Sequence, residues 1–171
     1  EPDSIAYPVR RILRDQKNIS FRMTKIENVD VENQKLHSSI GDIDYDYLVI
    51  ATGCTNNFFN FESVKDKLLT LKTVPDALNM RSYIYQNLEK AMTHRDSTSF
   101  GALMNIAIVG GGPAGIELAG ALSEMKHYVL PKDFPYLEFS KMQIHLYEMA
   151  PELLSAMSKE ASEKTLEYLK K

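Results

Sequence analysis

Three glycines at positions 110, 112 and 115 have the spacing of a phosphate-binding turn. Residues 106–120 read Ile-Ala-Ile-Val-Gly-Gly-Gly-Pro-Ala-Gly-Ile-Glu-Leu-Ala-Gly, so a β-branched run leads directly into the glycines. In such a turn Gly110 permits the tight bend, Gly112 lets a pyrophosphate approach the backbone, and Gly115 lets the next helix pack on the strand. Backbone N–H groups at the start of that helix stabilise phosphate charge. The residues predicted to bind a dinucleotide here are Gly110, Gly111, Gly112, Pro113, Ala114 and Gly115.

A carboxylate at the end of the next apolar run bears on which dinucleotide is bound. Residues 143–148 read Gln-Ile-His-Leu-Tyr-Glu, and Glu148 ends this run. A carboxylate in this place accepts a hydrogen bond from a ribose 2′-hydroxyl and repels a 2′-phosphate, which favours NADH over NADPH. The interval from the glycines exceeds the usual distance of about 20 residues, which we attribute to a loop around Pro131 and Pro135. The alternative is an exposed acid at a strand end.

Glu117 is a second carboxylate close to the glycine turn. It lies one turn into the predicted helix, where the helix dipole stabilises negative charge, so a surface capping role is open. The functional alternative places Glu117 beside the nicotinamide, which it would help to orient. Glu117 is therefore the candidate catalytic residue of this chain.

The remaining polar residues do not suggest a metal site or a hydrolase. The four histidines are scattered without metal-ligand spacing, and there is no Gly-x-Ser-x-Gly nucleophile elbow. The one cysteine, Cys54, can form neither an internal disulfide nor a redox dithiol. A net charge of −3 gives no excess of basic charge for nucleic acid. We expect no metal and no nucleic-acid partner.

Hydrophobic periodicity predicts the elements that position these residues. Thr73-Val74-Pro75-Asp76 reads as a helix start with proline in the first turn. Pro131 and Pro135 are expected to place a loop after the helix that follows the glycines. The elements predicted in this half are a helix at 73–93, a polar loop at 94–100, a strand at 104–109, a helix at 113–128, a strand at 143–148 and a helix at 158–170.

The first half of the chain is predicted to be richer in strands. A short helix is expected at 5–16, and a strand at 19–24, where apolar and polar residues alternate. A hairpin or meander is expected around Glu32-Asn33-Gln34, and Gly41-Asp42 turns the chain again. The run Leu48–Ala51 is apolar without alternation, which predicts a strand buried on both faces of a parallel sheet.

Three segments occur in the order that is found in one family of flavoproteins. The run Tyr45–Gly53, followed by Thr55–Phe59, looks like the second flavin-side motif of flavoproteins with two dinucleotide sites. The run Val109–Gly120 looks like their NADH-domain motif, and Leu71–Ala77 lies between the two. Together they are most similar to type II NADH dehydrogenases, which are single-subunit, FAD-containing NADH:quinone oxidoreductases. The resemblance covers nearly the whole chain in one register.

The resemblance implies an α/β fold, namely part of the FAD/NAD(P)-binding Rossmann-like three-layer fold. Residues 1–73 would belong to the FAD-binding domain, and residues 74–171 would be the first half of an inserted NADH-binding domain. Hydride would pass from NADH to FAD, and electrons would then pass to a membrane quinone. Ala51, Thr52 and Gly53 would lie against the FAD, the glycine turn and Glu148 would hold NADH, and Glu117 would lie near the flavin–nicotinamide contact.

The sequence also departs from the family pattern. It shows no glycine fingerprint for the FAD pyrophosphate before residue 45, and it ends before the further strands of an NADH domain. We therefore expect a middle fragment that lacks quinone-reducing activity, does not retain FAD and associates with itself through uncovered strand edges. The parent protein is expected in the cytoplasm, peripheral at the inner membrane face, with a quinone and the membrane surface as partners.

Two other interpretations stay open. One is a non-catalytic module that binds NAD(H) and senses or sequesters it. The other is a different FAD-dependent NAD(P)H reductase of the same two-dinucleotide plan, such as a ferredoxin, sulfide or apoptosis-related reductase. The absence of a dithiol distinguishes the chain from the disulfide reductases.

Overall fold

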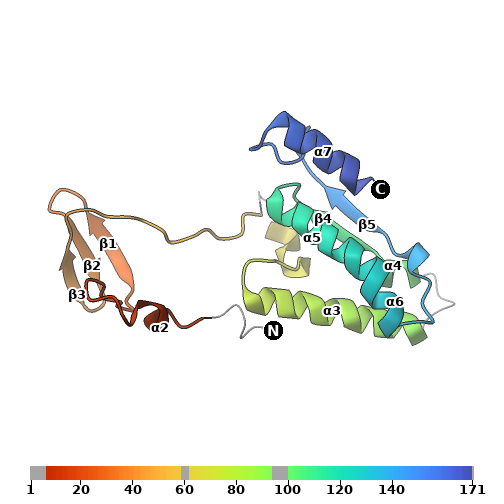
Figure 1. Ribbon diagram of the computed structural model, residues 1–171, viewed down its shortest axis with the longest axis horizontal. Coiled ribbons are helices and arrows are strands. Elements are labelled where there is room, and N and C mark those ends of the chain that lie inside the picture. Colours follow the sequence, from red (N-terminus) through yellow and green to blue (C-terminus); the bar gives the residue numbers. More distant parts are fainter. Residues whose placement is uncertain (1–6, 59–61, 94–99, 171) are drawn as a thin grey trace. The chain divides into compact units, whose positions relative to one another are not determined.

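The computed structural model describes residues 7–58, 62–93 and 100–170, which fall into two compact units (Figure 1). Unit 1 is Glu1–Leu68 and unit 2 is Leu69–Lys171. The sequence predicts a division after residue 73, with FAD bound by the first part and NADH by the second. This assignment of domains stays a prediction.

Unit 1 contains a three-stranded antiparallel meander, which confirms the hairpin predicted around residues 32–34. Asp30 pairs with Lys35 across the first hairpin, and Leu36 pairs with Ile43 across the second. Gly41 has a φ of 107°, a left-handed value that suits glycine at the second turn. The elements of unit 1 are helix α2 (Val9–Leu13), strands β1 (Ile26–Asp30), β2 (Lys35–Ser38) and β3 (Gly41–Asp44), and the 3-10 helix η1 (Glu62–Lys67). Helix α2 lies within the predicted helix 5–16, of which residues 5 and 6 lie outside the described residues.

Two strand predictions in unit 1 are wrong. Residues 19–24 are not a strand, and β1 begins only at Ile26. The run Leu48–Ala51 is neither a strand nor buried, and the side chain of Val49 is 86% exposed. A parallel strand forms only against a neighbouring strand, and no strand pairs with this run among the described residues. The apolar composition of this run therefore suits a buried strand, but a strand also requires a neighbour to pair with.

Helix α3 (Val74–Thr93) opens unit 2 and follows the prediction closely. Its start is a capping box, in which the N–H of Asp76 donates to Thr73 Oγ1 at 3.3 Å and the N–H of Thr73 donates to Asp76 Oδ2 at 2.8 Å. Hydrogen bonds from Thr73 and Lys72 hold the pKa of the Asp76 carboxyl below its ordinary value. Of the loop predicted at 94–100, residues 94–99 lie outside the described residues.

The rest of unit 2 is built around two parallel strands joined by a helical crossover (Figure 1). Ile106 pairs with Ile144 and Val109 with Tyr147, so the two strands run in register toward the same end. The predicted strands at 104–109 and 143–148 and the helix at 158–170 are confirmed within one or two residues. The elements are α4 (Phe100–Met104), β4 (Ile106–Val109), α5 (Pro113–Glu124), the π-helical turn η2 (Met125–Val129), α6 (Leu130–Asp133), the 3-10 helix η3 (Phe139–Lys141), β5 (Ile144–Tyr147) and α7 (Lys159–Leu169).

The predicted loop around Pro131 is only partly present. Pro131 lies in the first turn of α6, where its missing N–H and fixed φ are compatible with a helix. The π-helical turn before it continues the helical path from α5, so the irregular connection begins only at Phe134. Proline alone therefore predicted the break a few residues too early.

The core of unit 2 fixes the strand–turn–helix that carries the glycines. Ile108 of β4 packs with Ala119 and Leu122 of α5 in one buried cluster. A second buried cluster joins α3 to the segments around α6 and β5, and its side chains belong to Leu88, Ala91, Met104, Leu130, Phe134, Leu137, Phe139 and Met142. The hydroxyl of Tyr85 donates to Asp133 Oδ2 at 3.0 Å and ties α3 to α6. Within the described ranges, no helix combines the length and apolar character needed to cross a bilayer.

Candidate functional site

The glycine turn between β4 and α5 is a tight, backbone-lined bend. Gly110 has a φ of 116°, which only glycine adopts readily, and its N–H donates to the carbonyl of Tyr147 on β5 at 2.8 Å. Gly112 is extended, with φ −76° and ψ 179°, and Pro113 opens helix α5. The role predicted for Gly110, the bend itself, is confirmed.

Gly115 lies where helix and strand approach most closely. A Cβ atom at this position would stand 1.9 Å from the carbonyl oxygen of Gly110, far inside contact distance. The predicted packing role of Gly115 is therefore confirmed. A Cβ on Gly112, by contrast, would meet no atom within 4 Å, so this face of the turn is open. A phosphate can therefore approach the backbone at Gly112, whereas at Gly115 the carbonyl of Gly110 is in the way.

The first turn of α5 contains backbone N–H groups that the helix itself does not use. The first N–H groups of a helix have no intrahelical acceptor, which applies to Ala114 and Gly115, while Pro113 has no N–H. No acidic side chain lies in this first turn, so the positive end of the helix dipole is not neutralised there. Glu117 follows one turn later and its side chain is exposed. The arrangement can bind an anion.

Glu148 lies directly against the glycine turn. Its Oε2 accepts from the N–H of Gly111 at 2.5 Å, and its Oε1 accepts from the N–H of Ala150 at 2.7 Å. These two hydrogen bonds, of which the one from Ala150 has the larger effect, hold the pKa of the Glu148 carboxyl below its ordinary value. The group therefore stays ionised. The structure thus groups Glu148 with the glycines, although it lies 37 positions after Gly111 in the sequence.

The three residues expected to face FAD lie in the other unit. Ala51, Thr52 and Gly53 are exposed and belong to no strand. Gly53 has a φ of 72°, so it turns the chain in a conformation that suits glycine. Their assignment to FAD stays a prediction. Of the motif that follows them, Phe59 lies outside the described residues.

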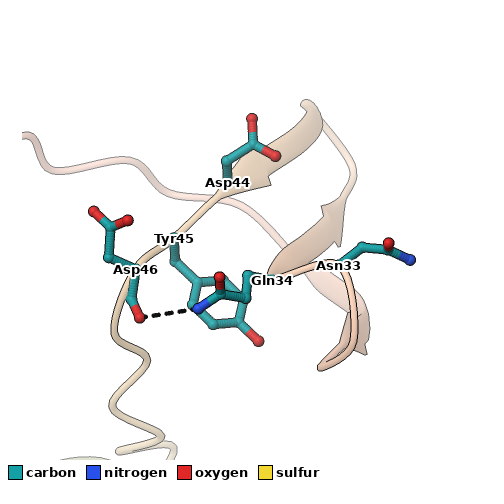
Figure 2. Close-up of a pocket in the computed structure, with 5 residues that line it drawn as sticks. All are labelled: Asn33, Gln34, Asp44, Tyr45 and Asp46. Carbon is teal, nitrogen blue, oxygen red and sulfur yellow. Dashed lines mark hydrogen bonds between the residues drawn. The ribbon is translucent and has the colours of Figure 1, made fainter.

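A polar depression in unit 1 was not anticipated from the sequence (Figure 2). It measures about 270 Å³ and is lined by Asn33, Gln34, Asp44, Tyr45 and Asp46. Gln34 Nε2 donates to the carbonyl of Asp46 at 3.1 Å and bridges its rim. The signal that could have indicated this depression is the group of polar residues Asn33, in the turn between β1 and β2, and Asp44 and Asp46, at and after the end of β3. In the described ranges no three His, Cys, Asp or Glu side chains gather as a metal site would require.

Comparison with known proteins places the whole chain in one group. The sequence model of the family described as "Pyridine nucleotide-disulphide oxidoreductase" matches residues 2–171. The chain is 27% identical to a type II NADH:quinone oxidoreductase of Mycobacterium tuberculosis, over 98% of this chain and 37% of that protein. It is 33% identical to the mitochondrial external alternative NAD(P)H-ubiquinone oxidoreductase B3 of Arabidopsis thaliana, over 95% of this chain and 30% of that protein.

Solved structures with a similar fold agree with this grouping. The structure of NDH2 from Plasmodium falciparum in complex with NADH matches with a TM-score of 0.69 and 25% identity, over 86% of this chain and 31% of that chain. A ferredoxin reductase from Rhodopseudomonas palustris shares the fold, with a TM-score of 0.62 and 20% identity. The α/β, Rossmann-like fold class predicted from the sequence is confirmed. The chain spans roughly a third of the length of the curated relatives it matches.

Proposed function

Because the chain belongs to the pyridine nucleotide-disulphide oxidoreductase family, we propose that it forms part of an FAD-dependent NADH:quinone oxidoreductase of type II. The observation that carries the proposal is the open glycine turn of residues 110–115 with Glu148 fixed against it. The names of two curated relatives and of the NADH-bound neighbour support the reaction class. NADH would supply a hydride to FAD, from which electrons would pass to a quinone.

The residues around the glycine turn fit NADH. The pyrophosphate would lie beside Gly112, where a Cβ would meet no atom within 4 Å, and the N–H groups of Ala114 and Gly115 would donate to its oxygens. Glu148 would accept from the adenosine ribose through the lone pairs that its two backbone hydrogen bonds leave over. Because the carboxylate stays ionised, it would repel the 2′-phosphate of NADPH, so we propose NADH as the preferred donor.

Glu117 is proposed to act at the nicotinamide end of the bound NADH. Its exposed side chain lies one helical turn beyond the first residues of α5, with the pyrophosphate site before it. A carboxylate in this place could accept a hydrogen bond from the carboxamide of the nicotinamide and orient the ring toward the flavin. This role is positional and requires no proton transfer by Glu117.

FAD is proposed to lie against Ala51, Thr52 and Gly53. These residues are small and accessible, and the left-handed Gly53 leaves the backbone open to a close approach. On this assignment residues 1–73 belong to the FAD-binding domain and residues 74–171 to the NADH-binding domain.

The proposal also covers the location of the whole protein and its partners. We place it peripherally at the inner membrane face, on the cytoplasmic side, where a membrane quinone is accessible. For the chain of 171 residues alone we propose self-association, because the outward face of β4 and β5 is uncovered and the side chain of Val109 is 76% exposed. Sedimentation at micromolar concentration tests this, and a monomer contradicts it.

Calorimetric titration with NADH tests the proposed nucleotide site. We expect NADH to bind more tightly than NADPH, and the Glu148→Ala variant to lose most of this preference. Unchanged affinity in Glu148→Ala would remove Glu148 from the site. For the intact protein, flavin absorbance and quinone-dependent NADH oxidation separate the enzyme from a module that only binds NAD(H). We expect neither from the chain of 171 residues alone.

A further inference from the structure

The segment after β5 touches the glycine turn at several points. Gly111 donates its N–H to Glu148 Oε2 at 2.5 Å, and its carbonyl oxygen accepts from the N–H of Leu154 at 2.9 Å. A Cβ atom on Gly111 would stand 2.6 Å from a terminal methyl of Leu153 and 3.0 Å from the Cβ of Glu148. Both backbone polar groups of Gly111 are therefore held by residues 148–154, which also pack against it.

Leu154 adopts an unusual backbone conformation to make its contact. Its φ is 51°, a left-handed value that residues other than glycine rarely adopt, while its side chain is buried. The carbonyl of Leu154 accepts from the N–H of Met157 at 2.7 Å, which closes a turn. In this turn the N–H of Leu154 donates to the carbonyl of Gly111. Such conformations persist where the surroundings fix them, and they cluster at functional sites.

These contacts divide the donors of the turn into two sets. The N–H groups of Gly110 and Gly111 donate to Tyr147 and Glu148 at the end of β5. The N–H groups of Gly112, Ala114 and Gly115 are not used in this way, and a Cβ on Gly112 would meet no atom within 4 Å. The donors of the first set are used within the protein, so they fix the shape of the turn against the end of β5. The donors of the second set remain available to a phosphate.

We propose that Glu148 is a positioning residue for the glycine turn: together with the backbone of Leu154 it holds Gly111 and sets the turn in its phosphate-binding shape before a nucleotide binds. Its effect on the nucleotide, which rests on the function proposed above, acts through the pyrophosphate as well as through the ribose. A contact with the ribose alone would leave the turn unaffected in the absence of ligand.

The first test measures the turn without any nucleotide, in the intact protein. In Glu148→Ala we expect the Gly111 amide to exchange its hydrogen faster by about tenfold or more, as expected for loss of a charge-assisted hydrogen bond. Glu148→Gln keeps the size of the side chain and one acceptor oxygen, so it should fold and give an intermediate rate. Glu152→Gln, an exposed carboxylate of the same segment, is the matched control and should change nothing. Unchanged exchange in both Glu148 variants overturns the proposal.

The second test separates the turn from the ribose. The probes are NADH and an NADH analogue that lacks the 2′- and 3′-hydroxyls of the adenosine ribose. We expect Glu148→Ala to weaken both by about fivefold or more, within the usual range for losing a charged hydrogen bond, and to raise KM with kcat nearly unchanged. A loss for NADH alone assigns Glu148 to the ribose only and overturns the proposal. If neither probe binds even the unmodified protein, the proposed function fails, whereas the exchange experiment still decides the positioning role.

Discussion

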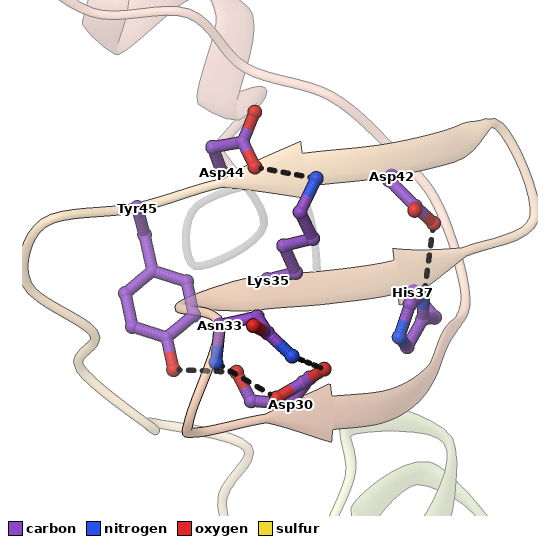
Figure 3. A network of polar contacts seen from close by, with 7 residues as sticks. All are labelled: Asp30, Asn33, Lys35, His37, Asp42, Asp44 and Tyr45. Atoms are coloured by element: carbon purple, nitrogen blue, oxygen red, sulfur yellow. Dashed lines mark hydrogen bonds and ion pairs between the residues drawn. The ribbon is translucent and has the colours of Figure 1, made fainter.

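The two units of this chain are stabilised in different ways. Among the described residues, all the buried side chains belong to unit 2, from Leu88 to Ser162. Unit 1 is held by strand pairing and by polar contacts at its surface (Figure 3). There Lys35 Nζ lies 3.0 Å from Asp44 Oδ1, and His37 Nδ1 lies 2.8 Å from Asp42 Oδ1.

This difference shows what makes the proposed nucleotide site rigid. Exposed ion pairs contribute little to stability because water and salt screen them, whereas a packed core fixes its elements against one another. The glycine turn lies in the unit with the core, and the exposed run at 51–53 lies in the unit without one. We therefore expect substitutions in unit 2 to change stability far more than substitutions in unit 1.

The largest effect is expected from Gly115→Ala. The new methyl group would stand 1.9 Å from the carbonyl oxygen of Gly110, so α5 and β4 must separate. We expect a loss of about 3 kcal/mol in the free energy of unfolding, the upper range for overpacking, measured by urea denaturation. Gly120→Ala on the same helix meets no atom within 4 Å and should be neutral or stabilising. Equal effects of the two substitutions would contradict the contact.

A cavity in the core is the next largest perturbation. Leu88 is 1% exposed and lies in the larger buried cluster, so Leu88→Ala should cost about 2–5 kcal/mol. Leu36→Ala removes the same atoms from a half-buried strand position in unit 1 and should cost less than half as much. Chemical denaturation measures the free energy of unfolding of both variants, and amide exchange shows which unit is destabilised. A larger cost at Leu36 would reverse the comparison.

Removal of the helix cap should have a moderate effect. In Thr73→Ala the N–H of Asp76 loses the side-chain acceptor that now lies 3.3 Å away. We expect a cost of about 1 kcal/mol, as for other N-caps, with faster amide exchange confined to the first turn of α3. Ser82→Ala, in the exposed middle of the same helix, serves as control and should not destabilise. A cost spread along all of α3 would argue against a capping role.

The smallest effect is expected from protonation in unit 1. Hydrogen bonds from the side chain and backbone of Asn33 lower the pKa of Asp30 (Figure 3). Because the folded pKa lies below the unfolded value, the stabilisation is present above the ordinary pKa of 3.8 and is lost as pH falls through the lowered value. Asn33→Ala should return the Asp30 titration, followed by NMR, toward its ordinary value. Asn28→Ala on β1 should leave it unchanged, and a shift there would point to a different cause.

What the sequence could predict was mostly local. The bend at Gly110, the packing of Gly115 and the helix start at Thr73-Val74-Pro75-Asp76 depend on neighbouring residues, and all three are confirmed. The parallel pairing of β4 with β5 follows the same logic, because a strand–helix–strand unit with this glycine spacing admits few alternatives.

What the sequence could not predict depends on contacts between distant residues. Leu48–Ala51 has the composition of a buried strand, but pairing requires a neighbour that composition does not reveal. The strand expected at 19–24 failed for the same reason. Glu148 was identified by its place after a strand, yet its hydrogen bond to Gly111 and the left-handed turn at Leu154 had no local signal. The π-helical turn that carries the chain past Pro131 had none either.

The pairing registers also bear on the order in which the chain folds. Asp30 and Lys35 meet after closing a loop of a few residues, whereas Ile106 and Ile144 are 38 positions apart. Hairpins form in about 1–10 microseconds, but a long closure loses chain entropy before its contacts form. The meander is therefore expected to form early and the parallel strands β4 and β5 late. On a ribosome, the glycine turn would acquire its shape only after residues 144–154 have emerged.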